Sequence, residues 1–455
     1  MSRDAPGAGA TKNRFSALIA RVRRSKFVRS VSVVVGGTAA SQAIAILATP
    51  VITRLYAPEA FGLLGVYNSL VLILAPVVCL DYHLAIVIPR SDPVARRLLA
   101  LSLHFAALIC ALGLVVMLIA GEPIAAALGI SGAGAVLLLV PAGVFASSAA
   151  RTLGQWLVRK RRFRPLAAAS ITQSSTTSVG KIALGLLWPS GAVLIVVTTA
   201  GHIARALWLW AVSGLGRVPP ADGGPEEGKA VTTAKAVARE YADFPLFHVP
   251  NTFAAKAGET APTIILAALF GPALAGFYEL ARRIIKIPSN LIANSVSKVY
   301  RARAAEAVHA GRSLRGDIAR TSGILIGLGI VPYGLVVSFG PSIFSVVFGA
   351  DWEPAGSIAR WLALWFAVHV AVRPATQALT VTRRLALRLL MSLAANAAKL
   401  GALVAVGSLT GSVVSAVATY AAIGVAADVV LLTVTLSLTG ARSVSRAGPF
   451  SGEPG

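Results

Sequence analysis

Long apolar segments separated by short polar ones run along almost the whole of this 455-residue sequence. A membrane-spanning helix needs about 20 mainly apolar residues, and a window of that length predicts twelve such helices. They cover residues 30–53, 62–82, 98–120, 133–157, 165–187, 191–212, 245–269, 274–298, 318–339, 355–380, 385–406 and 412–438. An even number of helices places both ends of the chain on one side of the membrane.

Composition agrees with this pattern. Hydrophobic residues make up 56% of the chain, charged residues only 13%, and the mean hydropathy is +0.75. These values are typical of a polytopic membrane protein and exclude a soluble fold. We therefore predict an all-α membrane protein.

Basic residues gather in every second predicted loop. Clusters of three to five Lys or Arg lie in or beside the loops that follow the second, fourth, sixth, eighth and tenth helices. Loops 121–132, 188–190, 270–273, 340–354 and 407–411 contain none, and the first loop has only Arg54. The positive-inside rule therefore predicts that both termini are cytoplasmic. The net charge of +24 is explained by these short clusters, so we expect no nucleic acid as a partner.

Two related halves are predicted. When the sequence is shifted by about half its length, LFGPALAG at 269–276 falls on LYAPEAFG at 55–62. A Pro- and Gly-rich linker at 213–243 then separates an N-terminal six-helix lobe at 29–212 from a C-terminal lobe at 244–440. Residues 1–28 form either an amphipathic helix on the inner leaflet or a disordered basic tail, and residues 441–455 form a cytoplasmic tail.

Several predicted helices carry charged residues, which are costly at membrane depth. The cations are Lys181, Lys256, Arg54, Arg205, Arg282, Arg283, Arg360, Arg373 and Lys399. Gln42, Gln173 and Thr177 belong to polar stripes on the first and fifth helices, while Glu259 and Asp428 are acids that could titrate. One interpretation is a central cavity that attracts a phosphate or pyrophosphate group. The other is that these charges pair internally and hold helices together.

No enzymatic motif accompanies these charges. The sequence lacks a nucleotide-binding loop, and the outer loops are short and nearly uncharged, so we expect neither catalytic residues nor a cofactor. Cys79 and Cys110 lie in apolar runs with no metal or redox spacing, which predicts buried thiols and no metal site. Trp352 and Trp188, with Trp208 and Trp210, are predicted to be interfacial aromatics.

Five short runs carry a family resemblance. They are PVITRLYAPEAFG at 50–62, YHLAIVIPRSD at 82–92, YADFPL at 241–246, AALFGP at 267–272 and FGADW at 348–352. With them, residues 30–440 resemble bacterial polysaccharide-biosynthesis flippases, which serve O-antigen and exopolysaccharide synthesis. These flippases belong to the multidrug/oligosaccharidyl-lipid/polysaccharide (MOP) exporter superfamily.

The resemblance implies two six-helix lobes around a central cavity in the bacterial inner membrane. It implies an undecaprenyl-pyrophosphate-linked oligosaccharide as substrate, moved from the cytoplasmic to the outer leaflet by alternating access. Coupling to a proton or sodium ion, and contact with a polysaccharide polymerase and glycosyltransferases, are compatible with it. The alternatives are an ion-coupled drug or small-solute antiporter of the same fold, and a membrane polysaccharide polymerase or ligase.

Overall fold

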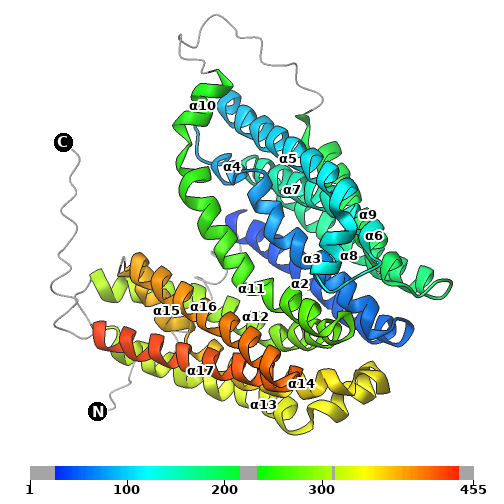
Figure 1. The fold of residues 1–455 in the computed structure, drawn as a ribbon. Helices are drawn as coiled ribbons and strands as arrows, with labels where there is room; N and C mark the ends of the chain where they lie inside the picture. The colour runs from blue at the N-terminus through cyan, green and yellow to red at the C-terminus, as the bar shows by residue number, and fades with distance from the viewer. Residues whose placement is uncertain (1–25, 216–232, 310–312, 383, 440–455) are drawn as a thin grey trace, which may run out of the picture.

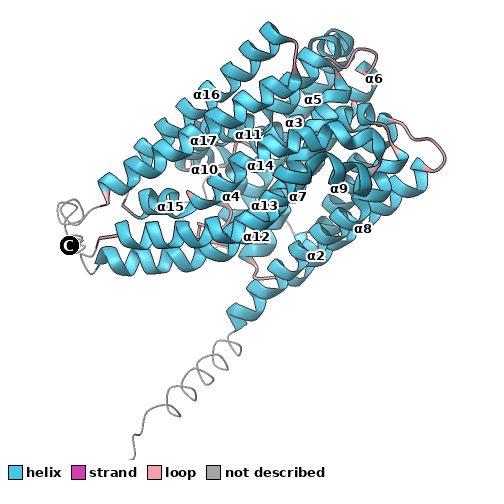
Figure 2. Cartoon of the chain, turned by 90° about the horizontal axis from the view of Figure 1, so that it is seen from below, coloured by secondary structure: helices cyan, strands magenta, loops and turns pink. Residues whose placement is uncertain are grey.

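The structure is a computed structural model that describes residues 26–215, 233–309, 313–382 and 384–439. These residues form helices joined by short loops, and the described part contains no strand (Figure 2). The N-terminal and C-terminal extensions and most of the predicted 213–243 linker lie outside the described residues. From the linker, only its first residues and the segment from 233 onward are described, and the latter includes a short helix, α10 (Ala234–Glu240).

Six long helices form the N-lobe and six form the C-lobe. The N-lobe comprises α2 (Lys26–Leu55), α3 (Pro58–Val78), α5 (Asp92–Ala127), α7 (Leu139–Arg159), α8 (Phe163–Gly185) and α9 (Gly191–Ser213). The C-lobe comprises α11 (Val249–Phe270), α12 (Pro272–His309), α13 (Arg315–Phe348), α14 (Glu353–Ala371), α16 (Leu385–Thr410) and α17 (Val413–Leu438). These helices correspond one to one with the twelve predicted segments.

Short elements join the long helices. They are α4 (Tyr82–Ala85), α6 (Gly134–Leu137), α10, the π-helix η2 (Phe244–His248), the 3-10 helix η3 (Ala350–Trp352) and α15 (Arg373–Val381). The second predicted helix, 62–82, ends earlier than expected because the backbone turns sharply after Val78, where Leu80 and Asp81 both have φ of 51°.

Ten of the described helical segments are long and apolar enough to cross a membrane, which makes this a multi-pass membrane protein. The two long helices outside that set are α8 and α12. Both lack the required apolar window because α8 is rich in hydroxyl side chains and α12 carries a run of charged residues around Arg282. A helix of this kind gains nothing by facing lipid tails and is expected to face protein or a cavity.

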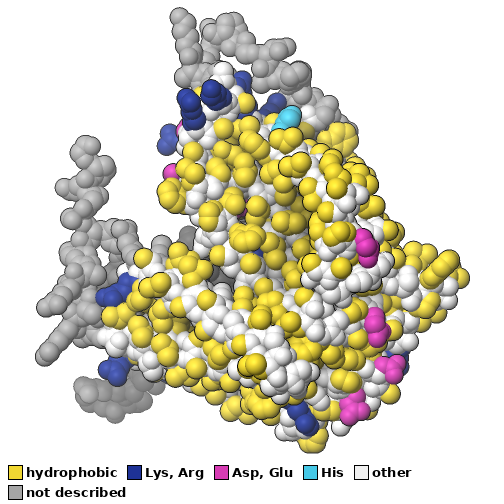
Figure 3. All heavy atoms as spheres, viewed as in Figure 1, with side chains coloured by type: hydrophobic (Ala, Val, Ile, Leu, Met, Phe, Trp, Pro, Cys, Tyr) yellow, Lys and Arg dark blue, Asp and Glu magenta, His cyan; other side chains and the backbone are white. Residues whose placement is uncertain are grey.

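The lobes meet mainly through α3, which packs against α7 and α9 of its own lobe and against α11 and α12 of the other. From this contact the lobes diverge toward the side on which α10 and α15 lie (Figure 1). The space-filling view shows a largely hydrophobic surface that is hollowed between the lobes on that side, with Lys and Arg gathered mostly at its ends (Figure 3).

Candidate functional site

The two copies of the internal repeat close one end of the molecule by direct backbone contact. A Cβ atom added to Gly62 of α3 would lie 1.8 Å from the carbonyl oxygen of Pro272, at the start of α12. Reciprocally, a Cβ on Gly276 would lie 2.0 Å from the carbonyl oxygen of Pro58. Only glycine permits this approach. The repeat therefore produces a pseudo-symmetric contact in which each copy seals against the other.

Trp352 reinforces the closed end. Its side chain is 1% exposed and packs edge-to-face against Phe61 of the N-lobe and Phe277 of the C-lobe. Its indole Nε1 donates a hydrogen bond to the carbonyl of Thr53 across the lobes, at 2.8 Å. The prediction of an interfacial role was wrong for Trp352, because the meeting of the lobes buries a residue that the sequence places in an outer loop.

The other three tryptophans predicted to be interfacial, Trp188, Trp208 and Trp210, have exposed side chains. Arg54 also acts at the closed end, where its guanidinium donates to the carbonyl of Val346 in α13, at 3.0 Å. This candidate cation therefore links α2 to the C-lobe.

A small cavity of about 50 Å³ lies between the lobes, beside the closed end. Helices α2, α3, α8 and α12 line it through Ala45, Thr49, Ile52, Phe61, Leu64, Thr177, Ser178, Lys181 and Arg283. Lys181 comes from the N-lobe and Arg283 from the C-lobe. The Lys181 ammonium has no hydrogen-bond or ion-pair partner among the described residues, and Arg283 donates only a long hydrogen bond, 3.4 Å, to the carbonyl of Ala45. Two cations thus share one cavity without a carboxylate.

Most other cations near this cavity are neutralised within their own lobe. Glu259 of α11 receives both Lys256, at 2.9 Å, and Lys286 of α12, at 2.7 Å. These three groups carry one net positive charge.

Glu279 of α12 forms a two-pronged pair with Arg282 and also accepts a hydrogen bond from Thr263, at 3.1 Å. Fork-shaped guanidinium–carboxylate pairs of this kind are strong and fix both side chains. These contacts match the interpretation that some intramembrane charges hold helices together.

The polar stripe of α8 is organised around Gln173. Its side-chain oxygen accepts from Arg205 of α9, at 3.0 Å, and its nitrogen lies 3.1 Å from Nδ1 of His202. One turn later, Thr177 donates to the Gln173 carbonyl and lines the cavity. Gln42 of α2 is exposed and lies outside the cavity lining.

A second polar cluster lies inside the C-lobe. Asp428 of α17 accepts from Nε1 of Trp365, at 2.9 Å, and faces Nδ1 of His369, at 3.0 Å. The ammonium of Lys399 stacks over the Trp365 ring, 4.6 Å from its centroid, and is largely buried. Sequence reasoning singled out the acid and the lysine but missed His369 as a partner.

The last two candidate cations lie apart from the cavity. Arg360 is exposed on α14 and donates to the carbonyl of Ser338, at 2.9 Å. Arg373 begins α15, and its buried Nε has no hydrogen-bond partner among the described residues.

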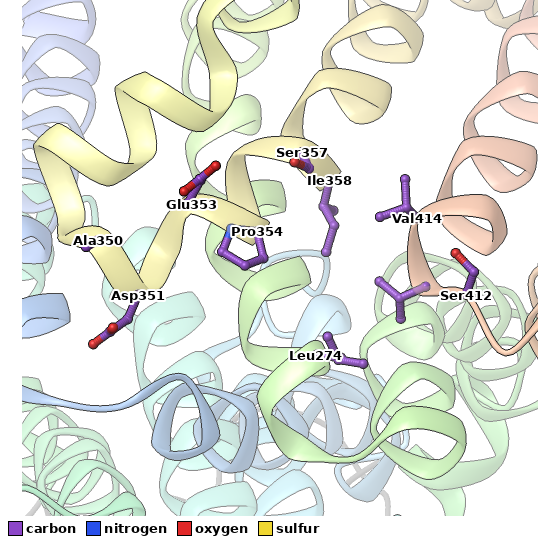
Figure 4. Close-up of a pocket in the computed structure, with 10 residues that line it drawn as sticks. Leu274, Ala350, Asp351, Glu353, Pro354, Ser357, Ile358, Ser412 and Val414 are labelled. Atoms are coloured by element: carbon purple, nitrogen blue, oxygen red, sulfur yellow. The ribbon is translucent and has the colours of Figure 1, made fainter.

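A larger pocket of about 660 Å³ opens at the closed end of the C-lobe (Figure 4). Its polar lining is acidic or hydroxylic, with Asp351 and Glu353 near η3 on one side and Ser412 before α17 on the other. It contains no Lys or Arg, so it does not suit an anionic group. We therefore take the smaller cationic cavity as the candidate site.

Comparisons with known proteins identify the family of this chain and its fold. A family profile for polysaccharide biosynthesis proteins matches residues 51–357. No curated protein matches the sequence.

Among solved structures, an inward-facing multidrug-resistance transporter of the MATE family and MOP superfamily aligns with a TM-score of 0.71 and 12% identity, over 89% of this chain and 96% of that chain. The lipid II flippase MurJ, in an inward closed conformation, aligns with a TM-score of 0.71 and 12% identity, over 90% and 88%. An outward-facing MATE transporter aligns with a TM-score of 0.60 and 14% identity, over 92% and 94%. The chain therefore belongs to the polysaccharide biosynthesis protein family and has the fold of MOP-superfamily transporters and flippases.

Proposed function

We propose that this protein is a flippase for an undecaprenyl-pyrophosphate-linked oligosaccharide in surface polysaccharide synthesis. It moves the repeat unit from the cytoplasmic to the outer leaflet of the bacterial inner membrane. The observation that carries the proposal is the pair of cations in the inter-lobe cavity. Lys181 and Arg283 present positive charge from opposite lobes, and an anionic pyrophosphate would offset their mutual repulsion.

The arrangement of the lobes supports alternating access. The lobes are sealed where the nearly uncharged loops lie, and they diverge toward the end that carries α10 and the basic clusters. By the positive-inside rule, the diverging end is cytoplasmic, so the lobes open toward the side on which the substrate is made. The similarity to a lipid II flippase is consistent with a lipid-linked substrate.

Two alternatives fit the geometry less well. A cation antiporter needs an acidic cavity, but Glu259 and Glu279 are each held by basic side chains. A polymerase or ligase needs catalytic groups at the outer face, and the Asp351–Glu353 pocket there lacks any basic side chain. Transport without covalent chemistry is therefore the better proposal, and the polymerase and glycosyltransferases are its expected pathway partners.

For ion coupling, Asp428 is the stronger of the two candidates. Glu259 forms ion pairs with two lysines, whereas the side-chain hydrogen-bond partners of Asp428 are Trp365 and His369. We expect Asp428→Asn to remove the dependence of transport on a proton or sodium gradient, measured in proteoliposomes with each gradient imposed separately. Unchanged gradient dependence would exclude Asp428.

The test of function is to deplete the protein in its host and to determine the leaflet on which lipid-linked oligosaccharide accumulates, using a membrane-impermeant reagent on spheroplasts and on inverted vesicles. Cytoplasmic accumulation supports the proposal. Outer-leaflet accumulation would indicate polymerisation or ligation, and no accumulation would favour the antiporter.

The test of the site compares Lys181→Gln and Arg283→Gln with Arg320→Gln, which removes an exposed cation of α13 outside the cavity. Hydrogen bonds to a charged group contribute about 1.5–3 kcal/mol, so each cavity variant should lose about 10-fold or more in flipping rate. The Arg320 variant should keep its rate at equal membrane abundance. Normal flipping by both cavity variants would exclude the cation pair.

A further inference from the structure

Four potential metal ligands meet at the diverging end, where the N-lobe contacts the start of α11. Cys79, Asp81 and His83 come from the turn between α3 and α4, and His248 comes from η2. Figure 1 shows α4 beside the upper part of α11. Ligand atoms of the first three residues all lie within 4.8 Å of one another. None of the four lines the inter-lobe cavity.

Three separations between these atoms lie close to those expected around a tetrahedral metal ion. Sγ of Cys79 lies 3.2 Å from Nδ1 of His83, which lies 3.8 Å from Oδ1 of Asp81. Oδ2 of Asp81 lies 3.4 Å from Nδ1 of His248. With bonds of about 2.0 Å to nitrogen and about 2.3 Å to sulfur, ligand atoms around Zn²⁺ stand about 3.3–3.8 Å apart.

Asp81 provides an independent reason to expect a ligand. Its side chain is 1% exposed, and Oδ1 accepts no hydrogen bond from any described residue. Oδ2 accepts one from Thr252 of α11, at 2.9 Å. Leu80 and Asp81 both adopt φ of 51°, a left-handed conformation that is uncommon for residues other than glycine. A buried carboxylate oxygen without a partner is costly, and a cation would satisfy it.

Metal binding sets the protonation of the cysteine and histidine ligands. A cysteine binds Zn²⁺ as the thiolate and a histidine binds it as the neutral imidazole, so binding of the ion releases protons.

We propose that Cys79, Asp81, His83 and His248 form a Zn²⁺-binding site. A thiolate, a carboxylate and two imidazoles are a ligand set that Zn²⁺ accepts, and the two anionic ligands balance its charge. His248 is 50% exposed on its side chain and provides the route of entry. Because the other three ligands belong to the N-lobe, the ion ties η2, which leads into α11, to that lobe. The sequence predicts no metal site, because Cys79, Asp81 and His83 follow no familiar metal-binding spacing and His248 lies far along the chain.

The experiment uses the full-length protein with a purification tag that contains no histidine, so that the tag binds no metal. Zn²⁺ is titrated at neutral pH, with the bound metal counted per chain and the thermal unfolding temperature recorded. Co²⁺ is then used as a spectroscopic substitute, since a cobalt–thiolate bond has its own charge-transfer band. The variants are Cys79→Ser and His248→Asn, with Cys110→Ser and His104→Asn as matched controls.

We expect one Zn²⁺ per chain, a higher unfolding temperature with the metal, and a thiolate band in the Co²⁺ form. His248→Asn, which alters a partly exposed side chain, should weaken binding by about 100-fold or more, because even residues that only orient a ligand contribute about 10–100-fold. Cys79→Ser should remove the band, while both controls keep binding and band. Absence of saturable binding, equal affinity in His248→Asn, or a band that persists in Cys79→Ser would overturn the proposal.

Discussion

The glycine contacts at the closed end make a direct prediction about conformation. In Gly276→Ala, the new Cβ would lie 2.0 Å from the carbonyl oxygen of Pro58 and 3.0 Å from the backbone nitrogen of Gly62. Real Cβ atoms essentially never come closer than 3.0 Å to another heavy atom, so α12 must move away from α3 by at least about 1 Å. Both obstacles are backbone atoms, and no side-chain rotation can relieve the clash.

The cost of that movement can be estimated from overpacked cores, where an added methyl group destabilises by about 1–3 kcal/mol. Here the strain exists only while the closed end is sealed, because separating the lobes removes it. A difference of this size changes a two-state equilibrium by about 5- to 150-fold. We therefore expect Gly276→Ala to shift the protein from the sealed state toward one that is open at this end.

The measurement is the distance between two spin labels, attached to Pro189→Cys and Thr410→Cys, by double electron–electron resonance spectroscopy. Both positions are exposed at the closed end: Pro189 lies in the loop before α9 of the N-lobe, and Thr410 ends α16 of the C-lobe. The two native cysteines are buried and unlabelled. The distance distribution should gain a longer component in Gly276→Ala. The control is Gly327→Ala in α13, where an added Cβ meets nothing within 4 Å.

The reasoning would be refuted if Gly276→Ala gave the same distance distribution and the same thermal stability as the wild type. A loss of stability with no change in distance would mean that the contact supports the fold but does not gate the cavity. The control variant separates these outcomes from a general effect of alanine, which normally stabilises a helix relative to glycine.

Two further predictions concern buried contacts. Glu279→Gln leaves Arg282, only 12% exposed, without its carboxylate and should lower the unfolding free energy by about 3 kcal/mol. The double variant Glu279→Gln/Arg282→Gln should lose less, because no unpaired charge remains buried. Thermal unfolding in detergent compares the two variants, and equal losses would contradict the pairing. Trp352→Phe removes the hydrogen bond to Thr53 and should lower the unfolding free energy by about 1–2 kcal/mol. It should also lengthen the distance between the same two spin labels. An unchanged distance would show that the indole does not hold the lobes together.

The twelve helices were predictable because each must bury or expose a run of apolar residues as long as the membrane is thick. Two of the twelve helices are less apolar than the others. Helix α8 and helix α12 fail a strict apolarity criterion, yet they line the cavity through Thr177, Lys181 and Arg283. Their reduced hydropathy is itself a functional signal, since a spanning helix with polar side chains must face something other than lipid.

Charge pairing was much less predictable. Helical spacing allows Glu259 to meet Lys256, three residues away, but nothing in the sequence shows that Lys286 of the next helix shares the same carboxylate. The burial of Trp352 could not be predicted either, because it depends on the contact between the two lobes. The repeat was visible in the sequence, whereas the contact between its two copies required the fold.

The seal and the proposed binding site are connected through one face of α12. Gly276, which touches α3, and Arg283, which enters the cavity, are seven residues apart and therefore lie two turns apart on the same side of the helix. Any movement that separates Gly276 from Pro58 also displaces Arg283 relative to Lys181. An anion held between the two cations would stabilise the arrangement that brings them together, so occupancy of the cavity and closure of the seal must influence each other. Coupling of this kind, in which the ligand binds two states differently, is what alternating access requires.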